Sequence, residues 1–94
     1  NRYLGMVRQW QQLFYKKRYS FTNIEAQPDF VKLAEAYGAV GIRVEKKEDV
    51  IPALNKSLKI TDRPTIIDFR IEREENVFPM VPAGAPISEM IELA

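Results

Sequence analysis

The chain opens with apolar residues at helical spacing. They recur at i, i+1, i+4, i+7 and i+8 over residues 5–15, which predicts a helix with one apolar stripe. Such a stripe most often packs into a core. The members of this stripe are Met6, Val7, Trp10, Leu13 and Phe14, with Arg8, Gln9, Gln11 and Gln12 between them. A basic triplet over residues 16–18 then suits the negative end of the helix dipole, and we expect it to be solvated.

The next segments predict a second helix and a first strand. After a loop over residues 19–27, apolar spacing of i, i+3, i+4 and i+7 predicts a helix over residues 28–37. Pro28 is a suitable first helical residue, Asp29 belongs in the first turn, and Gly38 is a natural stop. Branched residues alternate over residues 39–44, as in a short strand. Gly41 within it indicates that a helix packs closely on that face.

A third helix and a second strand follow. The helix is predicted over residues 46–60, with Ile51, Leu54 and Leu58 as its buried stripe. Pro52 is compatible with it only if the regular helix starts near residues 49–51. Residues 65–71 form the clearest strand of the chain, and their apolar opening is typical of a parallel strand covered on both sides.

The C-terminal part is expected to be coil followed by a short helix. Two prolines interrupt the apolar residues 77–82, and a helix is predicted over residues 87–93 with Met90 and Ile91 facing inward. The order is therefore helix-helix-strand-helix-strand-coil-helix, an α/β pattern with one right-handed βαβ unit. Two strands are too few for a stable open sheet. We expect residues 1–94 to be the C-terminal portion of a larger, doubly wound parallel-sheet domain.

Composition narrows the chemistry. The chain has 94 residues, of which 46% are hydrophobic and 29% charged, as in an ordinary globular domain. A net charge of +1 gives no strong case for nucleic acid or a membrane, and no apolar run is long enough to span one. The sequence contains no Cys and no His, so zinc sites, Ser-His-Asp triads and Cys-His dyads are excluded within it. Any demanding reaction would need a cofactor or other parts of a protein.

The N-terminal stretch has some features of a magnesium diphosphate site. Asn1 offers a side-chain oxygen, the following turn offers a main-chain carbonyl, and the helix N-terminus favours a diphosphate. An Asn before a helix is, however, more often a helix cap. From these residues alone, Asn1 could be either a magnesium ligand or a helix cap.

Three motifs carry a family resemblance. They are NRYLGMVRQWQQLFYKKRYS at residues 1–20, PDFVKLAEAYG at 28–38 and ENVFPMVPAG at 75–84. Together they cover nearly the whole chain, which resembles the catalytic large subunit of acetolactate synthase (acetohydroxyacid synthase). The resemblance implies a C-terminal part of a domain that binds thiamine diphosphate and Mg²⁺. Other thiamine-diphosphate enzymes share the fold without the GMVxQW string.

The resemblance also implies roles for the residues around the first turn. Asn1 matches the second Asn of the metal motif, a magnesium ligand through its side chain. Tyr3 matches the position whose main-chain carbonyl completes the metal site. Tyr3, Leu4, Gly5 and Met6 are the implied cofactor-binding residues.

Further residues match the substrate and inhibitor pocket of that family. Met6 and Val7 correspond to positions beside the thiazolium ring and the substrate. Trp10 corresponds to the residue that shapes the pocket for the second 2-keto acid and for herbicides. Ala83 corresponds to a small residue in the C-terminal segment that folds over the same channel.

Other parts of that family's site lie outside these residues. They are the Gly-Asp-Gly half of the metal motif, the Glu that activates the cofactor, and the FAD-binding domain. No catalytic residue is expected within residues 1–94, and we expect this chain alone to lack synthase activity. In the intact enzyme pyruvate would lose CO₂, and the remaining two-carbon unit would add to a second pyruvate or to 2-ketobutyrate, in branched-chain amino acid biosynthesis.

The resemblance carries expectations about partners as well. They are the rest of the catalytic chain, a homodimer or tetramer, and a regulatory small subunit, in the cytoplasm or, in a eukaryote, a plastid or mitochondrion. Two alternatives stay open: another thiamine-diphosphate carboligase or decarboxylase, and a non-catalytic α/β binding module. Trp10 and the PMVP segment argue against the first, and a Gly-Asp-Gly upstream of Asn1 would decide against the second.

Overall fold

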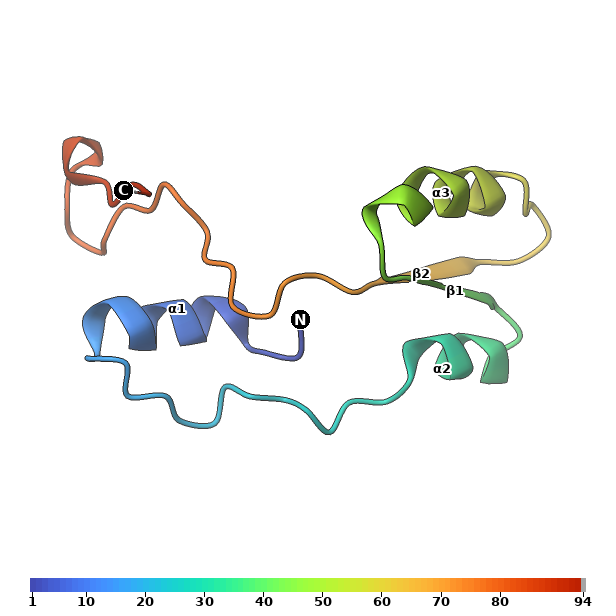
Figure 1. The fold of residues 1–94 in the computed structure, drawn as a ribbon, viewed down its shortest axis with the longest axis horizontal. Coiled ribbons are helices and arrows are strands. Elements are labelled where there is room, and N and C mark those ends of the chain that lie inside the picture. The colour runs from blue at the N-terminus through green and yellow to red at the C-terminus, as the bar shows by residue number, and fades with distance from the viewer. Residues whose placement is uncertain (94) are drawn as a thin grey trace. The chain divides into compact units, whose positions relative to one another are not determined.

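The computed structural model describes residues 1–93, which form two compact units (Figure 1). The strand unit comprises Asn1 and Ala26–Glu72. The α1 unit comprises Arg2–Glu25 and the described residues from Arg73 onward. The α1 unit is therefore built from two segments that are far apart in the sequence.

The strand unit is a parallel βαβ unit preceded by a helix. Its elements run α2 (Phe30–Ala36), β1 (Val40–Val44), the 3₁₀ turn η1 (Lys47–Asp49), α3 (Val50–Leu58) and β2 (Thr65–Phe69). The strands pair in parallel, with Val40 opposite Thr65 and Val44 opposite Phe69. The predicted α/β class and parallel strand pair are thus confirmed, with each strand slightly shorter than expected.

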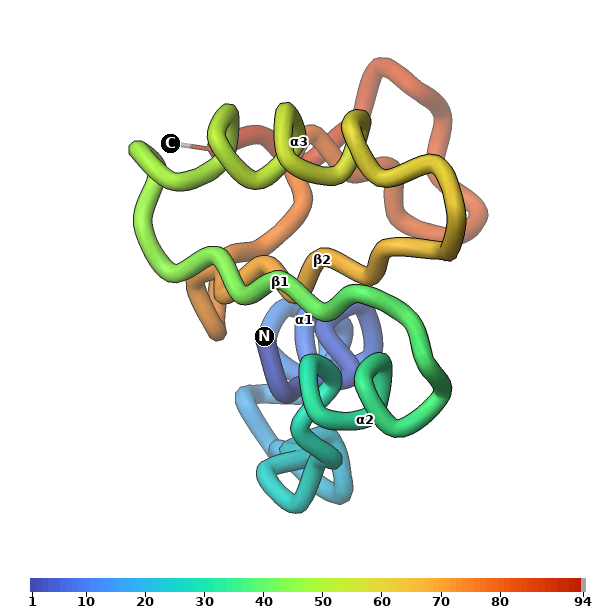
Figure 2. The backbone as a smooth tube through the Cα atoms, turned by 90° about the vertical axis from the view of Figure 1, so that its right-hand side faces the viewer, coloured from blue at the N-terminus to red at the C-terminus, as the bar shows by residue number. Residues whose placement is uncertain are grey.

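The two helices α2 and α3 cover opposite faces of the strand pair, as two views of the chain show (Figures 1 and 2). On the α2 face the packing is very close. A Cβ atom on Gly41 would lie 2.7 Å from the carbonyl oxygen of Val31 and 2.9 Å from its Cα. The expectation that Gly41 marks a close helix contact is confirmed, and the partner is the backbone of α2.

Helix α2 begins two residues later than predicted, because Asp29 caps it. The Asp29 carboxylate accepts hydrogen bonds from the backbone N–H groups of Val31 (3.1 Å) and Lys32 (3.2 Å). Pro28 therefore precedes the cap and is not the first helical residue. Past the C-terminus, Gly38 has φ of 75°, as expected for the residue that ends the helix.

The predicted buried stripe of α3 is wrong. Ile51 and Leu58 are mostly exposed among the described residues, and the buried residue is Ala53. Val50, Ser57 and Ile60 are half-buried on the same side as Ala53. The inward side of α3 is therefore the one that carries Ala53, and not the side with the larger Ile51, Leu54 and Leu58. Regular helix starts at Val50, which makes Pro52 compatible, as expected.

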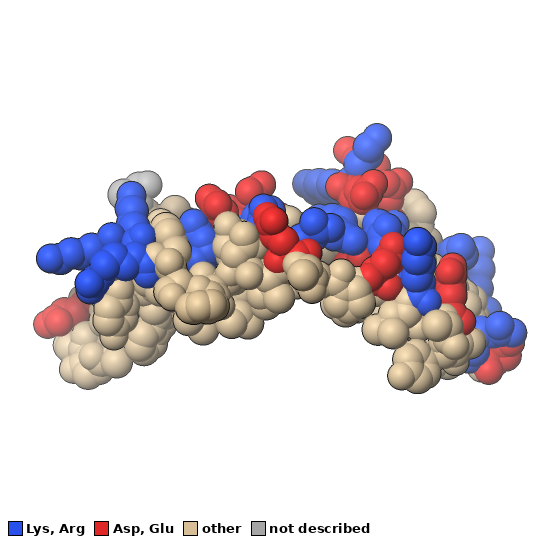
Figure 3. Space-filling model, turned by 90° about the horizontal axis from the view of Figure 1, so that it is seen from below, with Lys and Arg blue, Asp and Glu red and all other residues tan. Residues whose placement is uncertain are grey.

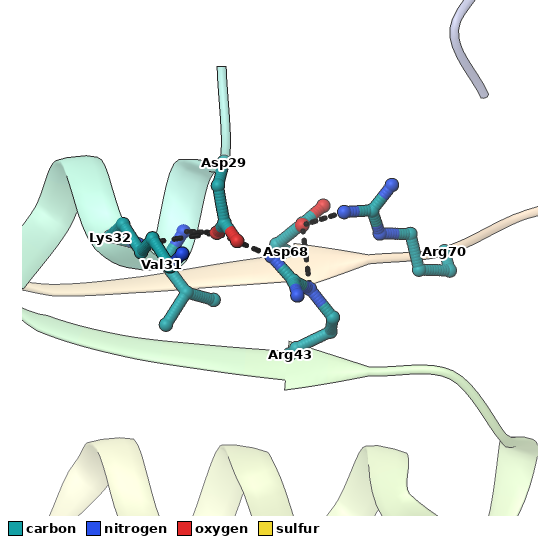
Figure 4. Close-up of polar contacts among 6 residues, drawn as sticks. All are labelled: Asp29, Val31, Lys32, Arg43, Asp68 and Arg70. Atoms are coloured by element: carbon teal, nitrogen blue, oxygen red, sulfur yellow. Dashed lines mark hydrogen bonds and ion pairs between the residues drawn. The ribbon is translucent and has the colours of Figure 1, made fainter. Parts of the chain in front are cut away.

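A four-residue ionic cluster joins α2 to both strands (Figure 4). Arg43 on β1 donates to the carboxylates of Asp29 and of Asp68, its neighbour in register on β2. Arg70 lies 3.1 Å from Asp68 on the same side. Hydrogen bonds from the Lys32 backbone and the Arg43 guanidinium hold the pKa of Asp29 below its usual value, while desolvation opposes this effect. The same contact raises the pKa of Arg43.

This cluster predicts an acid-sensitive contribution to stability. Because the Asp29 pKa is lower folded than unfolded, its stabilisation is present above the unfolded value near 4 and is lost as pH falls through the folded value. We expect Asp29→Asn, which retains a capping oxygen, to flatten the dependence of unfolding free energy on pH below about 4. Urea unfolding at several pH values measures this. If the unfolding free energy of Asp29→Asn depends on pH below about 4 as steeply as that of the wild type, the prediction is contradicted.

The α1 unit contains α1 (Gly5–Phe14) and the 3₁₀ turn η2 (Ile87–Glu89). The predicted C-terminal helix over residues 87–93 is wrong. After η2 the backbone is extended, and Ile91 forms an antiparallel bridge with Met80 through bonds of 2.7 and 3.0 Å. This pairing satisfies backbone groups that a continued helix would have used, and it leaves Met90 and Ile91 half-buried, as expected.

Charged side chains of both signs cover the visible face of the strand unit in Figure 3. Acidic and basic groups are interspersed on its visible face, at the right of Figure 3. This distribution agrees with the net charge of +1. In residues 1–93, no helix is long and apolar enough to cross a membrane.

Candidate functional site

The first turn is held by pairing with a later segment. The N–H of Leu4 donates to the carbonyl of Thr22 (2.8 Å), and the N–H of Ile24 donates to the carbonyl of Arg2 (2.8 Å). Tyr3 and Asn23 face each other in this antiparallel bridge. Arg2 has φ of 59°, which turns the chain just before α1. Backbone pairing between residues 2–4 and residues 22–24 therefore fixes the turn that leads into α1.

The N-terminus of α1 lacks side-chain caps. Leu4 occupies the cap position without a side-chain hydrogen bond, and the first turn contains no acidic residue. The N–H groups at this end carry the positive pole of the helix dipole and favour an anion. This arrangement is compatible with the expectation that the N-terminus of α1 favours a diphosphate.

The polar side of α1 is the buried side. Arg8 is 8% exposed and Gln9 only 1%. In Figure 1 the orange segment that follows β2 passes alongside α1, and Gln9 hydrogen-bonds there to Val77 and Met80. Polar side chains can be buried in this way only because their hydrogen-bonding groups find partners.

Arg8 lies within a ring of aromatic and acidic side chains. Its guanidinium carbon is 4.7 Å from the centre of the Tyr19 ring and 5.2 Å from that of Tyr3. It also donates to Gln12 Oε1 (3.0 Å) and pairs with Glu74 (3.5 Å). Arg73 lies over the Tyr3 ring as well, 4.7 Å from its centre. These contacts hold the side chain of Tyr3, whose carbonyl is an expected metal ligand.

The apolar stripe of α1, expected to be core, is largely exposed among the described residues. Phe14 is 41% exposed, and Leu13 is half-buried. Core placement of Phe14 is therefore wrong, because the polar side of the helix takes the inward position. The more exposed members are Met6, Val7 and Trp10, at 48%, 52% and 42%.

Two cavities lie along this apolar side of α1. The larger has a volume of about 400 Å³ and is lined by Met6, Val7, Trp10, Gln11 and Tyr15. The smaller, of about 160 Å³, is lined by Trp10, Phe14, Tyr15, Pro82 and Ala83. The four expected pocket residues therefore border these two cavities: Met6 and Val7 line the larger, Ala83 lines the smaller, and Trp10 lines both.

An aromatic pair on α1 borders the smaller cavity. Trp10 and Phe14 meet edge to face, with ring centres 5.8 Å apart and an interplanar angle of 84°. Such a pair is about 0.5–1.5 kcal/mol more favourable than its buried area alone implies. Phe14, a member of the predicted stripe, and Tyr15 line this cavity, although no pocket role was predicted for either. The i, i+4 spacing of Trp10 and Phe14 was the available signal for Phe14.

The expected metal ligands belong to different units. Asn1 belongs to the strand unit, and Tyr3 belongs to the α1 unit. In the Tyr3–Asn23 bridge, the two ladder bonds are made by Arg2 and Leu4, and the Tyr3 carbonyl takes no part in them. Within residues 1–93, no three Asp, Glu, His or Cys side chains gather as a metal site.

Sequence reasoning missed the residues that hold this arrangement together. They are Arg8, Gln9, Tyr19 and Thr22. Thr22 is 3% exposed and donates to Gln11 Oε1 (3.0 Å). The only available signal was the unbroken polar side of α1 opposite its apolar stripe, and this pattern equally fits a solvated face.

The strand unit, with its parallel strand pair and flanking helices, has the arrangement of α/β proteins. Comparison with known families is specific: residues 1–69 match the family "Thiamine pyrophosphate enzyme, C-terminal TPP binding domain". The chain therefore belongs to this family.

Three relatives of the chain are acetolactate synthases or their large subunits. The chain is 52% identical over 91 residues to the acetolactate synthase of Mycobacterium leprae and to the acetolactate synthase large subunit of Corynebacterium glutamicum. It is 48% identical over 92 residues to acetolactate synthase isozyme 2 large subunit of Escherichia coli. These alignments cover 93–98% of the chain but only 14–17% of the relatives.

Proposed function

We propose that this chain is part of an acetolactate synthase large subunit and forms one wall of its thiamine diphosphate site. The observation that carries the proposal is the identity of 48–52% to acetolactate synthases over nearly the whole chain. The clustering of Met6, Val7, Trp10 and Ala83 along one side of α1 supports it. The intact protein would convert two pyruvates, or pyruvate and 2-ketobutyrate, in branched-chain amino acid biosynthesis.

The residues present fit part of a magnesium diphosphate site. Asn1 supplies a hard oxygen ligand of the kind that Mg²⁺ prefers, and the Tyr3 carbonyl supplies a second. The uncapped N–H groups at the start of α1 suit the diphosphate. Thiamine diphosphate, when bound, supplies the electron sink for decarboxylation. FAD and the remaining metal ligand belong to other parts of the protein.

The residues of the chain position substrates and exclude water. Met6 and Val7 give the cavity an apolar lining, in which polar and charged groups of the substrate interact more strongly than in water. Trp10 and Ala83 narrow the adjoining space, where the second 2-keto acid would bind. None of these residues titrates near neutral pH, so their work is orientation and not proton transfer.

The proposal predicts acetolactate formation by the full-length protein and none by residues 1–94 alone. The full-length protein should require added thiamine diphosphate and Mg²⁺ after dialysis against a chelator. Colorimetric detection of acetolactate from pyruvate measures both. A full-length protein that decarboxylates pyruvate only to acetaldehyde would support the alternative of a decarboxylase. Acetolactate formed by the isolated chain would contradict its assignment as an incomplete part of the site.

A further inference from the structure

Gln9 joins α1 to the segment that carries Ala83. Its Nε2 donates to the carbonyl of Val77 (2.8 Å) and to Met80 Sδ (3.1 Å), and its Oε1 accepts from the N–H of Val77 (2.8 Å). One side-chain amide therefore pairs with both backbone groups of a residue 68 positions away. At 1% exposure, these bonds are sheltered from competing water.

The position of Gln9 links this pairing to the cavity. Its neighbour Trp10 projects about 100° further round the helix, toward the apolar side. Six residues beyond Val77, Ala83 lies against the same cavity as Trp10. Between them, Met80 is held by its bridge to Ile91. Gln9 therefore fixes Val77, at the start of the segment, and Ala83, near the end of that segment, lines the same cavity as Trp10.

We propose that Gln9 is a positioning residue that sets the separation between Trp10 and Ala83, and thereby the fit of the second 2-keto acid. The inference rests on the proposed function. Gln9 touches neither cavity, so it acts only through the placement of these two residues. A small apolar pocket discriminates by methylene groups only while its walls stay in place.

The test compares Gln9→Glu with Gln12→Glu in the full-length protein. At position 9 the change removes the donor and sets a carboxylate oxygen against the Val77 carbonyl. At position 12 the same change keeps the acceptor, because Gln12 Oε1 accepts from Arg8 (3.0 Å) and Asn76 (3.1 Å). The readouts are the apparent KM for 2-ketobutyrate at saturating pyruvate, the Kd for thiamine diphosphate, and hydrogen exchange at the Val77 amide.

We expect Gln9→Glu to raise the KM for 2-ketobutyrate by about tenfold, the scale of discrimination by one methylene. The cofactor Kd should stay within about twofold of the wild type, while exchange over residues 77–83 accelerates. Gln12→Glu should leave all three readouts near wild type. Gln9→Met, which is neutral and similar in length, should shift the KM in the same direction.

Three results would overturn the inference while the proposed function stands. The first is an unchanged KM for 2-ketobutyrate in Gln9→Glu. The second is a weaker affinity for thiamine diphosphate that accompanies the rise in KM, and the third is failure of both Gln9 variants to fold; either would give Gln9 a purely structural role. A wild-type protein that forms no acetolactate would instead overturn the proposed function, and this inference with it.

Discussion

Asn1→Ala is expected to weaken Mg²⁺ binding to the full-length protein by on the order of 100-fold. Loss of a group in the shell outside a metal's ligands already costs about 10–100-fold in affinity, so loss of a direct ligand should cost at least as much. The concentration of Mg²⁺ that half-saturates thiamine diphosphate binding measures the effect. High Mg²⁺ should restore activity, because the cofactor and substrate contacts are unchanged.

Two further variants show whether the oxygen of Asn1 is what matters. Asn1→Asp keeps a side-chain oxygen and should retain most of the Mg²⁺ affinity. Asn55→Ala makes the same chemical change as Asn1→Ala at an exposed position on α3 and should have no effect. Equal Mg²⁺ affinities in Asn1→Ala and the wild type would leave Asn1 only the role of a local structural residue.

Gly41→Ala is expected to lower the free energy of unfolding by about 2–3 kcal/mol. The added Cβ would lie 2.7 Å from the Val31 carbonyl oxygen, so α2 must move away from the strands. Inserting a methyl group into a packed interior typically costs about 1–3 kcal/mol. The clash is with backbone and not with a flexible side chain, which places the estimate in the upper part of that range. Urea unfolding measures the change.

Gly38→Ala is the matched control for this effect. At Gly38 an added Cβ meets nothing within 4 Å, but φ is 75°. Its cost should be only about 1 kcal/mol, from the left-handed backbone conformation. If Gly41→Ala is no more destabilising than Gly38→Ala, the close packing of α2 on β1 contributes little to stability.

The sequence predicted the order and type of elements well where local chemistry dominates. Gly38 requires a positive φ, Pro52 limits the start of α3, and Gly41 requires a close neighbour. These are constraints of single residues on their own backbone, and they hold in any tertiary context. The family resemblance likewise rests on strings of adjacent residues.

Burial was predicted poorly, because it depends on which partner each helix face meets. In α1 the Gln9 amide pairs with Val77 backbone groups, and this contact turns the polar side inward. In α3 the small side chain of Ala53 is buried, and the larger Ile51 is exposed. Helical periodicity identifies the faces of a helix but not their partners. The C-terminal helix failed for a similar reason, since Ile91 pairs with Met80.

A crystal structure of the full-length protein with thiamine diphosphate and Mg²⁺ tests most directly whether the start of this chain holds the magnesium diphosphate. We predict that the Asn1 side-chain oxygen and the Tyr3 carbonyl bind Mg²⁺, with the diphosphate at the N-terminus of α1. Mg²⁺ and diphosphate bound without contact to residues 1–6 would contradict this prediction.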